Sequence, residues 1–176
     1  MCIVVVFMNY SAGIPIFPAV IKINFERNVN VDQEDIFNTM ADVLDYPIIL
    51  PENYISVKVI NETDDIIYTE EEVAEAGIKT SMLVKHVIIP YQKHSIQVLN
   101  GYAQGTNITV LYEHENSDTK ITVNGDIHVF GVLLPLALLT QNNIKHAFDT
   151  VLNDFVEYTR NNSTPIAPIN NDIPNP

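Results

Sequence analysis

The stretch that decides the fold is DVLDYPIILPENYISVKVI, residues 42–60. Apolar residues that lead into it recur at the spacing of one helix face, at Ile36, Met40, Val43 and Leu44. With Asp32 as a helix cap, this pattern predicts an amphipathic helix over residues 33–44. Pro47 and Pro51 forbid its continuation. Residues 55, 57 and 59 are apolar and alternate with polar ones, so the pattern predicts that the stretch ends in a strand.

Alternation of the same kind predicts strands on both sides of this stretch. One precedes it, with Ile21, Ile23 and Phe25 on one face. Five follow it, at residues 66–73, 80–89, 95–99, 106–114 and 119–130. The turns between these strands are too short for parallel crossovers, so the sheet is expected to be antiparallel.

A different period appears after Pro135. Apolar residues recur at helical spacing at Ile144, Phe148, Val151, Leu152 and Phe155, which predicts a long helix over residues 138–160. Such an apolar stripe must be buried, and the inner face of the sheet is the available surface. The expected fold is α+β, a curved antiparallel sheet of about seven strands around a long C-terminal helix.

Three segments are expected along the chain. Residues 1–17 form an apolar N-terminal extension, read as an edge strand, an anchor or the product of a misassigned start. Residues 18–160 form the ligand-binding domain. Residues 161–176 are rich in Asn and Pro and are expected to be a disordered tail.

The composition of the chain argues against some classes of function. The chain has 176 residues, one Cys and a formal net charge of −13. Such an acidic surface repels nucleic acid, so no nucleic-acid partner is expected. No run reaches the length of a membrane span, and a cytoplasmic protein is expected. Peripheral membrane contact, and a protein partner bound through the acidic surface or the N-terminal run, stay open.

The order of elements and the quoted stretch resemble the START-like, or helix-grip, superfamily, also called SRPBCC and including polyketide cyclase/dehydrase and coenzyme Q-binding-like members. Asp42, Tyr46, Pro47 and Pro51 match a D-x-x-x-Y-P-x-x-x-P pattern that precedes the second strand in that superfamily. Residues 101–131 resemble its later strands, and residues 133–158 resemble its final helix. The resemblance implies a cavity between sheet and helix that holds an apolar or amphipathic molecule such as a lipid, quinone, isoprenoid or polyketide-like compound.

Candidate ligand-binding residues follow from this implied cavity. Ile48 and Ile49 are expected near its mouth, and the residues expected to line it come from both helices, the connection and the sheet: Ile36, Met40, Leu44, Tyr46, Leu50, Met82, Phe148, Leu152 and Phe155. The first hypothesis is therefore a non-catalytic binding or carrier protein. No cofactor and no metal site are expected, because no established ligand spacing occurs.

Two other functions stay open. A cyclase- or dehydratase-type enzyme in the same cavity would use His86, with Glu70 or Glu72, in proton transfer. The other reading of these residues is structural: a hydrogen-bonded buried histidine and a solvated, acidic sheet edge. The third hypothesis is an acidic protein-interaction module.

Overall fold

Seven antiparallel strands form one sheet in the part of the chain that the structure describes, with the order β1-β7-β6-β5-β4-β3-β2. The structure is a computed structural model, and it describes residues 19–75, 77–116, 118–133 and 141–163. The elements along the chain are β1 (Ala19–Val29), α1 (Gln33–Ala41), the 3-10 helix η1 (Val43–Asp45), α2 (Tyr46–Ile49), β2 (Tyr54–Glu62), β3 (Ile66–Glu75), β4 (Ile78–Ile89), β5 (Lys93–Val98), β6 (Asn107–Glu115), β7 (Asp118–Val129) and α3 (Gln141–Asn162).

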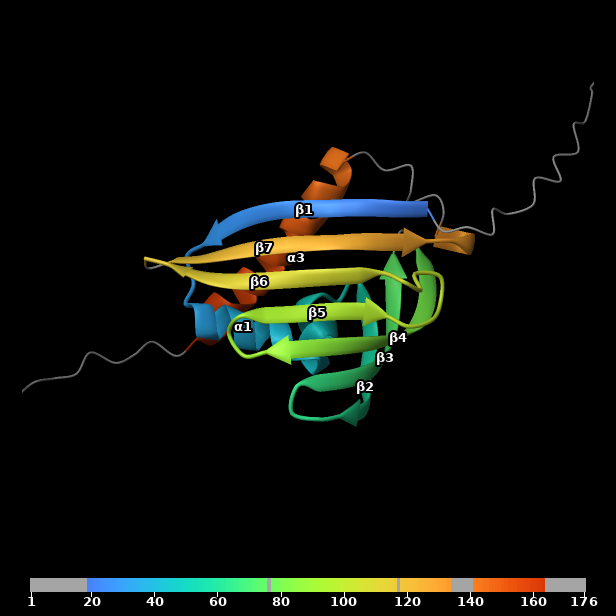
Figure 1. Cartoon of the computed structure of the whole chain (residues 1–176), viewed down its shortest axis with the longest axis horizontal. Helices are drawn as coiled ribbons and strands as arrows, with labels where there is room; N and C mark the ends of the chain where they lie inside the picture. The colour runs from blue at the N-terminus through green and yellow to red at the C-terminus, as the bar shows by residue number, and fades with distance from the viewer. Residues whose placement is uncertain (1–18, 76, 117, 134–140, 164–176) are drawn as a thin grey trace, which may run out of the picture.

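The sheet is a meander of β2 to β7 with the first strand, β1, added at the β7 edge. Strands β2 to β7 pair in sequence order, and β1 then pairs with β7, from Ala19 opposite Val129 to Val29 opposite Thr119. The helical segment between β1 and β2 therefore connects the two edges of the sheet. In Figure 1 the helices α1 and α3 are both seen behind the sheet, so they cover the same face. The predicted α+β helix-grip architecture is confirmed.

The long helix α3 packs its apolar stripe against this face, as predicted. Leu152, Phe155 and Val156 are buried in one core with residues of β1, β6, β7 and α1. Arg27 on β1 also contacts this helix, since its Nη1 donates to the Asp149 carbonyl oxygen over 3.2 Å. The side of β1 that faces the helix carries Ile23 and Phe25, in line with its alternating sequence.

The first helix ends earlier than the sequence predicts. Helix α1 stops at Ala41, and Asp42 then caps the next turn, because its carboxylate accepts a hydrogen bond from the Leu44 backbone N–H over 3.2 Å. Pro47 does not end a helix but lies in the first turn of the short helix α2, where a missing N–H costs nothing. The expected single helix over residues 33–44 is therefore two short helices joined at a capping aspartate.

Two of the expected segments fall outside the described residues. The apolar run at residues 1–17 and residues 164–176 of the predicted tail both lie there, as does the predicted start of the last helix at residue 138. Helix α3 continues to Asn162, two residues beyond the predicted end of the domain. None of the helices in the described residues is long and apolar enough to cross a membrane.

Candidate functional site

A cavity of about 310 Å³ lies between the inner face of the sheet, the segment that follows α1, and helix α3. Its wall is mostly aromatic and aliphatic. The described residues that line it are Phe25, Met40, Tyr46, Leu50, Asn53, Tyr54, Val73, Ala74, Met82, His94, Ile96, Ile108, Val110, Val123, Phe148, Val151, Leu152 and Phe155. An apolar wall with a few polar groups is the usual composition of a small-molecule site.

Seven of the nine residues expected at the cavity do line it: Met40, Tyr46, Leu50, Met82, Phe148, Leu152 and Phe155. Ile36 does not, because it is fully buried in the core under α1. Leu44 does not, because its side chain is 54 % exposed. Extrapolating one helical face from Ile36 to Leu44 was wrong, since the helix is interrupted at Asp42 and η1 turns Leu44 outward. The part these residues play in binding stays a prediction.

The side chains between Pro47 and Pro51 face different surroundings. Leu50 lines the cavity and Ile49 is buried, but Ile48 is 65 % exposed. Of the three, only Leu50 lines the cavity, and the expectation that the connection borders its mouth stays a prediction. A helical turn cannot direct three consecutive side chains to one face.

Eleven further lining residues were missed by sequence reasoning, most of them on strands. Phe25 and Val123 occupy inward positions of predicted alternating strands, and Val151 belongs to the predicted helical stripe, so these three could have been chosen. Alternation in β5 also places His94 on the same side as Ile96 and Val98. Of these three, His94 and Val98 are buried and Ile96 is half-buried. Asn53 and Tyr54 lie at the turn into β2, where periodicity carries no signal.

Tyr46 joins the connection to the cavity wall. Its hydroxyl donates to the Met40 carbonyl oxygen over 2.9 Å, and that carbonyl lies in the last turn of α1, where backbone acceptors lack helical partners. Its ring meets Tyr54 and Phe155 edge-on, with centroids 5.1 and 5.6 Å apart. The tyrosine of the D-x-x-x-Y-P pattern therefore both satisfies the end of α1 and forms the wall.

A buried polar chain runs across three strands beside the cavity. Nε2 of His86 lies 2.8 Å from Oε1 of Glu71, and its Nδ1 lies 3.0 Å from Nε2 of His94. The Thr69 hydroxyl donates to the same Glu71 oxygen over 2.7 Å. All four side chains are at most 1 % exposed. Of the four, only His94 reaches the cavity wall.

The carboxylate beside His86 is therefore not one of those predicted. Glu70 is exposed and Glu72 half-buried on the opposite side of β3, whereas Glu71 points inward. Successive residues of a strand face opposite sides. Predicting Glu70 and Glu72 as the inward residues therefore assigned the wrong face of β3 to the interior. The prediction of an inward carboxylate next to His86 identifies the right histidine and the wrong glutamates.

Burial favours the neutral form of each titratable group of the wall. It lowers the pKa of His94 from 6.5 to about 3, with His86 acting in the same direction and the Met40 backbone opposing it. Burial also raises the pKa of Tyr54 well above its ordinary value, with the Glu71 charge adding to the effect. For Tyr46 burial again comes first, followed by the nearby tyrosines and Glu71.

The neutral state of His94 makes stability depend on pH. Between pH 6.5 and about 3 the unfolded chain protonates this ring and the folded chain does not, so stability is lost as the pH falls. We expect this group to cost about 2 kcal/mol between pH 7 and pH 5. Urea unfolding at both pH values should show a smaller loss in His94→Gln. The exposed His114, changed to Gln, is the control and should keep the wild-type loss. Equal losses in all three proteins would contradict the assignment.

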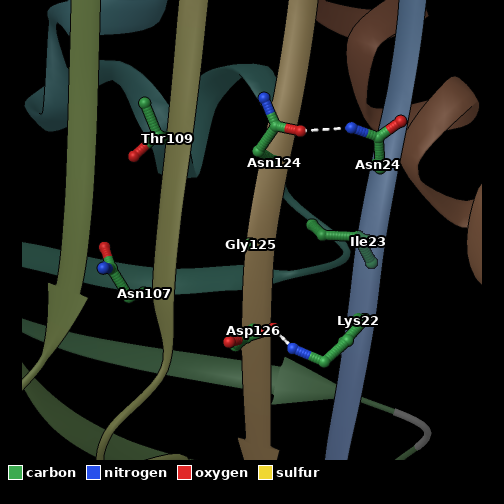
Figure 2. A pocket seen from close by; sticks show the side chains of 8 residues that line it. All are labelled: Lys22, Ile23, Asn24, Asn107, Thr109, Asn124, Gly125 and Asp126. Carbon is green, nitrogen blue, oxygen red and sulfur yellow. Dashed lines mark hydrogen bonds and ion pairs between the residues drawn. The ribbon is translucent and has the colours of Figure 1, made fainter.

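A second hollow, about 580 Å³ and more open, lies on the outer face of the sheet (Figure 2). Figure 2 shows its polar side chains on neighbouring strands, with Lys22 paired to Asp126 over 2.9 Å and Asn24 bonded to Asn124. At its centre Gly125 permits a close approach of β6, because a Cβ there would lie 2.7 Å from the Asn107 carbonyl oxygen. Four of its polar side chains are thus already paired with one another and its wall is less apolar, so the inner cavity is the better candidate site.

Comparison with known proteins identifies the fold. No protein-family model matches the chain. No curated protein matches it either. Among solved structures, the Zhui aromatase/cyclase from a Streptomyces species is 14 % identical and has a TM-score of 0.64, with 85 % of this chain and 99 % of that one covered. A START superfamily protein from Mycobacterium smegmatis is 10 % identical with a TM-score of 0.59, covering 77 % and 92 %.

A third similar structure is norcoclaurine synthase from Thalictrum flavum in complex with dopamine and hydroxybenzaldehyde. It is 13 % identical, has a TM-score of 0.56, and the match covers 80 % of this chain and 89 % of that one. The chain therefore has the helix-grip fold of the START-like, or SRPBCC, superfamily, as its sequence predicts.

Proposed function

We propose that the protein binds a compact apolar or amphipathic small molecule in the cavity between the sheet and α3. The observation that carries this proposal is the cavity itself, about 310 Å³ and lined by residues of the hydrophobic core. Protein interiors rarely keep voids larger than a water molecule, because each void forfeits dispersion contacts. A cavity of this size in the middle of a core is therefore more consistent with a ligand site than with imperfect packing.

The size of the cavity limits the ligand. A volume of about 310 Å³ lies at the lower end of the range of about 300–1,000 Å³ that is usual for small-molecule pockets. This size favours a compact molecule of one or two rings over a long isoprenoid or acyl tail. The edge-on aromatic pairs around Tyr46 favour a flat ring among them. The norcoclaurine synthase structure, which holds dopamine and hydroxybenzaldehyde in the same fold, supports this size class.

The direct test is binding of a neutral fluorescent probe of two rings, 2-naphthol, to the wild-type protein and to a variant with a filled cavity. Val73 lines the cavity and shares the inward face of β3 with Glu71, so Val73→Phe should lower the affinity for the probe at least about tenfold, since the larger side chain takes the space of the ligand. Leu44→Phe is the matched control, because Leu44 is exposed and outside the cavity, and it should bind as the wild type does.

Two results would contradict the proposal. One is the absence of any saturable binding by the wild type. The other is an equal loss of affinity in Val73→Phe and Leu44→Phe. Native mass spectrometry of gently purified protein adds an independent readout, because a bound compound from the expression host should co-purify with the wild type and not with Val73→Phe.

A second candidate function is acid-base catalysis on the bound molecule, of the cyclase or dehydratase kind. The observation that favours it is the buried chain from Glu71 through His86 to His94 at the cavity wall. A carboxylate that orients one histidine, which in turn bonds another, is an arrangement suited to proton transfer. In this proposal His86 and Glu71 take the parts that the sequence assigned to His86 with Glu70 or Glu72. If a substrate is found, unchanged turnover in His86→Ala would remove this candidate.

A further inference from the structure

The cavity wall contains no charged side chain among the described residues that line it. All nine Lys and Arg of the chain lie in the described residues, and none of them lines the cavity. No Asp or Glu lines it either. Its titratable groups are Tyr46, Tyr54 and His94. Each is neutral near pH 7, because the pKa of a tyrosine lies near 10 even before burial raises it, and burial lowers the pKa of His94 to about 3. A bound molecule would therefore meet a neutral surface.

A carboxylate lies just behind this neutral wall. Glu71 is buried on β3 two positions before Val73, which lines the cavity, and it is directly opposite Met82, another wall residue. Its charge contributes to the raised pKa of both Tyr46 and Tyr54, so its negative field reaches the wall. A negative group on a ligand would experience the same field as a tyrosinate, with the same sign and the same low dielectric.

The groups that could compensate a ligand charge are already in use. His86 is bonded to Glu71 on one side and to His94 on the other, and Thr69 donates to the Glu71 carboxylate. An anion in the cavity would be desolvated without a cationic partner. A cation would also lose its hydration without a direct anionic partner, since the Glu71 carboxylate is held behind the wall by its own hydrogen bonds.

From this arrangement we infer that the cavity selects an uncharged ligand, and that Glu71, held by His86 and Thr69 behind the wall, is the group that excludes anions. The inference rests on the proposed function and narrows it, because the fold and the cavity shape alone would admit carboxylates, amines and neutral molecules of the same size. Fatty acids, aromatic acids and phosphorylated compounds are excluded as ligands. Neutral phenols, alcohols, ketones and lactones of one or two rings remain.

The test is a set of three probes that share one naphthalene ring and differ in charge: naphthalene-2-methanol, 2-naphthoate and 2-naphthylmethylammonium. Affinities are measured at pH 7 by isothermal titration calorimetry, or by displacement of the neutral fluorescent probe. We expect the neutral alcohol to bind at least about 100-fold more tightly than the carboxylate, because burying an unpaired charge outweighs the gain from burying the ring. The ammonium should fall between the two.

A variant of Glu71 shows how much of the selection against anions comes from its charge and how much from the neutral wall. Glu71→Gln keeps a group that can bond Thr69 and His86 but removes the charge, and the ratio of alcohol to carboxylate affinity should fall by about tenfold. Glu70→Gln is the matched control, since Glu70 is exposed on the other face, and its ratio should equal that of the wild type. The wild-type series decides the main point even if Glu71→Gln does not fold.

The outcomes distinguish this inference from the proposed function. Carboxylate or ammonium binding within about threefold of the alcohol would overturn the inference and leave the cavity as a ligand site. An unchanged ratio in folded Glu71→Gln would overturn the part assigned to Glu71. If none of the three probes, nor the neutral fluorescent dye, binds the wild type, the proposed function fails, and the inference fails with it.

Discussion

Replacing Glu71 with Ala is expected to destabilise the protein by about 3–5 kcal/mol, because about 1–3 kcal/mol is lost for each buried polar group that is left without its hydrogen-bond partner. The carboxylate is 1 % exposed and is bonded to both His86 and Thr69. Its removal leaves two buried polar groups without their acceptor and opens a void beside them. Urea unfolding monitored by circular dichroism at pH 7 measures the change.

Glu70→Ala is the control for this experiment. It removes a carboxylate from the adjacent position of the same strand, but Glu70 is exposed, so its loss should change stability by less than about 0.5 kcal/mol. A difference of several kcal/mol between neighbouring glutamates would establish that Glu71 faces inward. Similar effects of the two substitutions would show that the polar chain is not formed as described.

Replacing Phe155 with Ala is expected to cost about 3–5 kcal/mol, as is usual for a large aromatic side chain in a core. Phe155 is buried on α3, meets the Tyr46 ring with centroids 5.6 Å apart, and lines the cavity. It therefore connects α3 to Tyr46 and the segment of residues 42–60. Thermal and urea unfolding should both report the loss.

Glu157→Ala is the matched control on the same helix. Glu157 is exposed two residues further along α3, and Ala is a strong helix former, so its replacement should leave stability within about 0.5 kcal/mol of the wild type. If Phe155→Ala were equally mild, α3 would not be packed on the sheet through this face.

The strands and the long helix could be predicted because the apolar residues of each repeat at the spacing of a strand or of a helix. Ile21, Ile23 and Phe25 alternate with polar residues, and Phe148, Leu152 and Phe155 recur at helical spacing. The structure places these residues as predicted, with Phe155 and Leu152 against the sheet. Five of the expected residues that line the cavity belong to such periods: Met40, Met82, Phe148, Leu152 and Phe155.

Local periods fail where the backbone changes direction. Asp42 ends α1 by capping the following turn, so the helical phase carried from Ile36 no longer applies at Leu44. The side chain of Leu44 is exposed although its spacing from Ile36 fits the buried face. A capping hydrogen bond between Asp42 and the Leu44 N–H depends on the detailed turn geometry, which the apolar pattern does not contain.

The order of the elements, the antiparallel sheet and the helix packed on it follow from the sequence alone, since periodicity and turn spacing are local properties. Which glutamate is buried, in contrast, depends on the folded chain. In β3 both faces carry apolar and acidic residues, so alternation does not choose between Glu71 and its neighbours. Strand pairing and the curvature of the sheet bring Glu71 of β3, His86 of β4 and His94 of β5 within hydrogen-bonding distance. Contacts between separate strands depend on register and on which face is covered, and both are set by the folded chain as a whole.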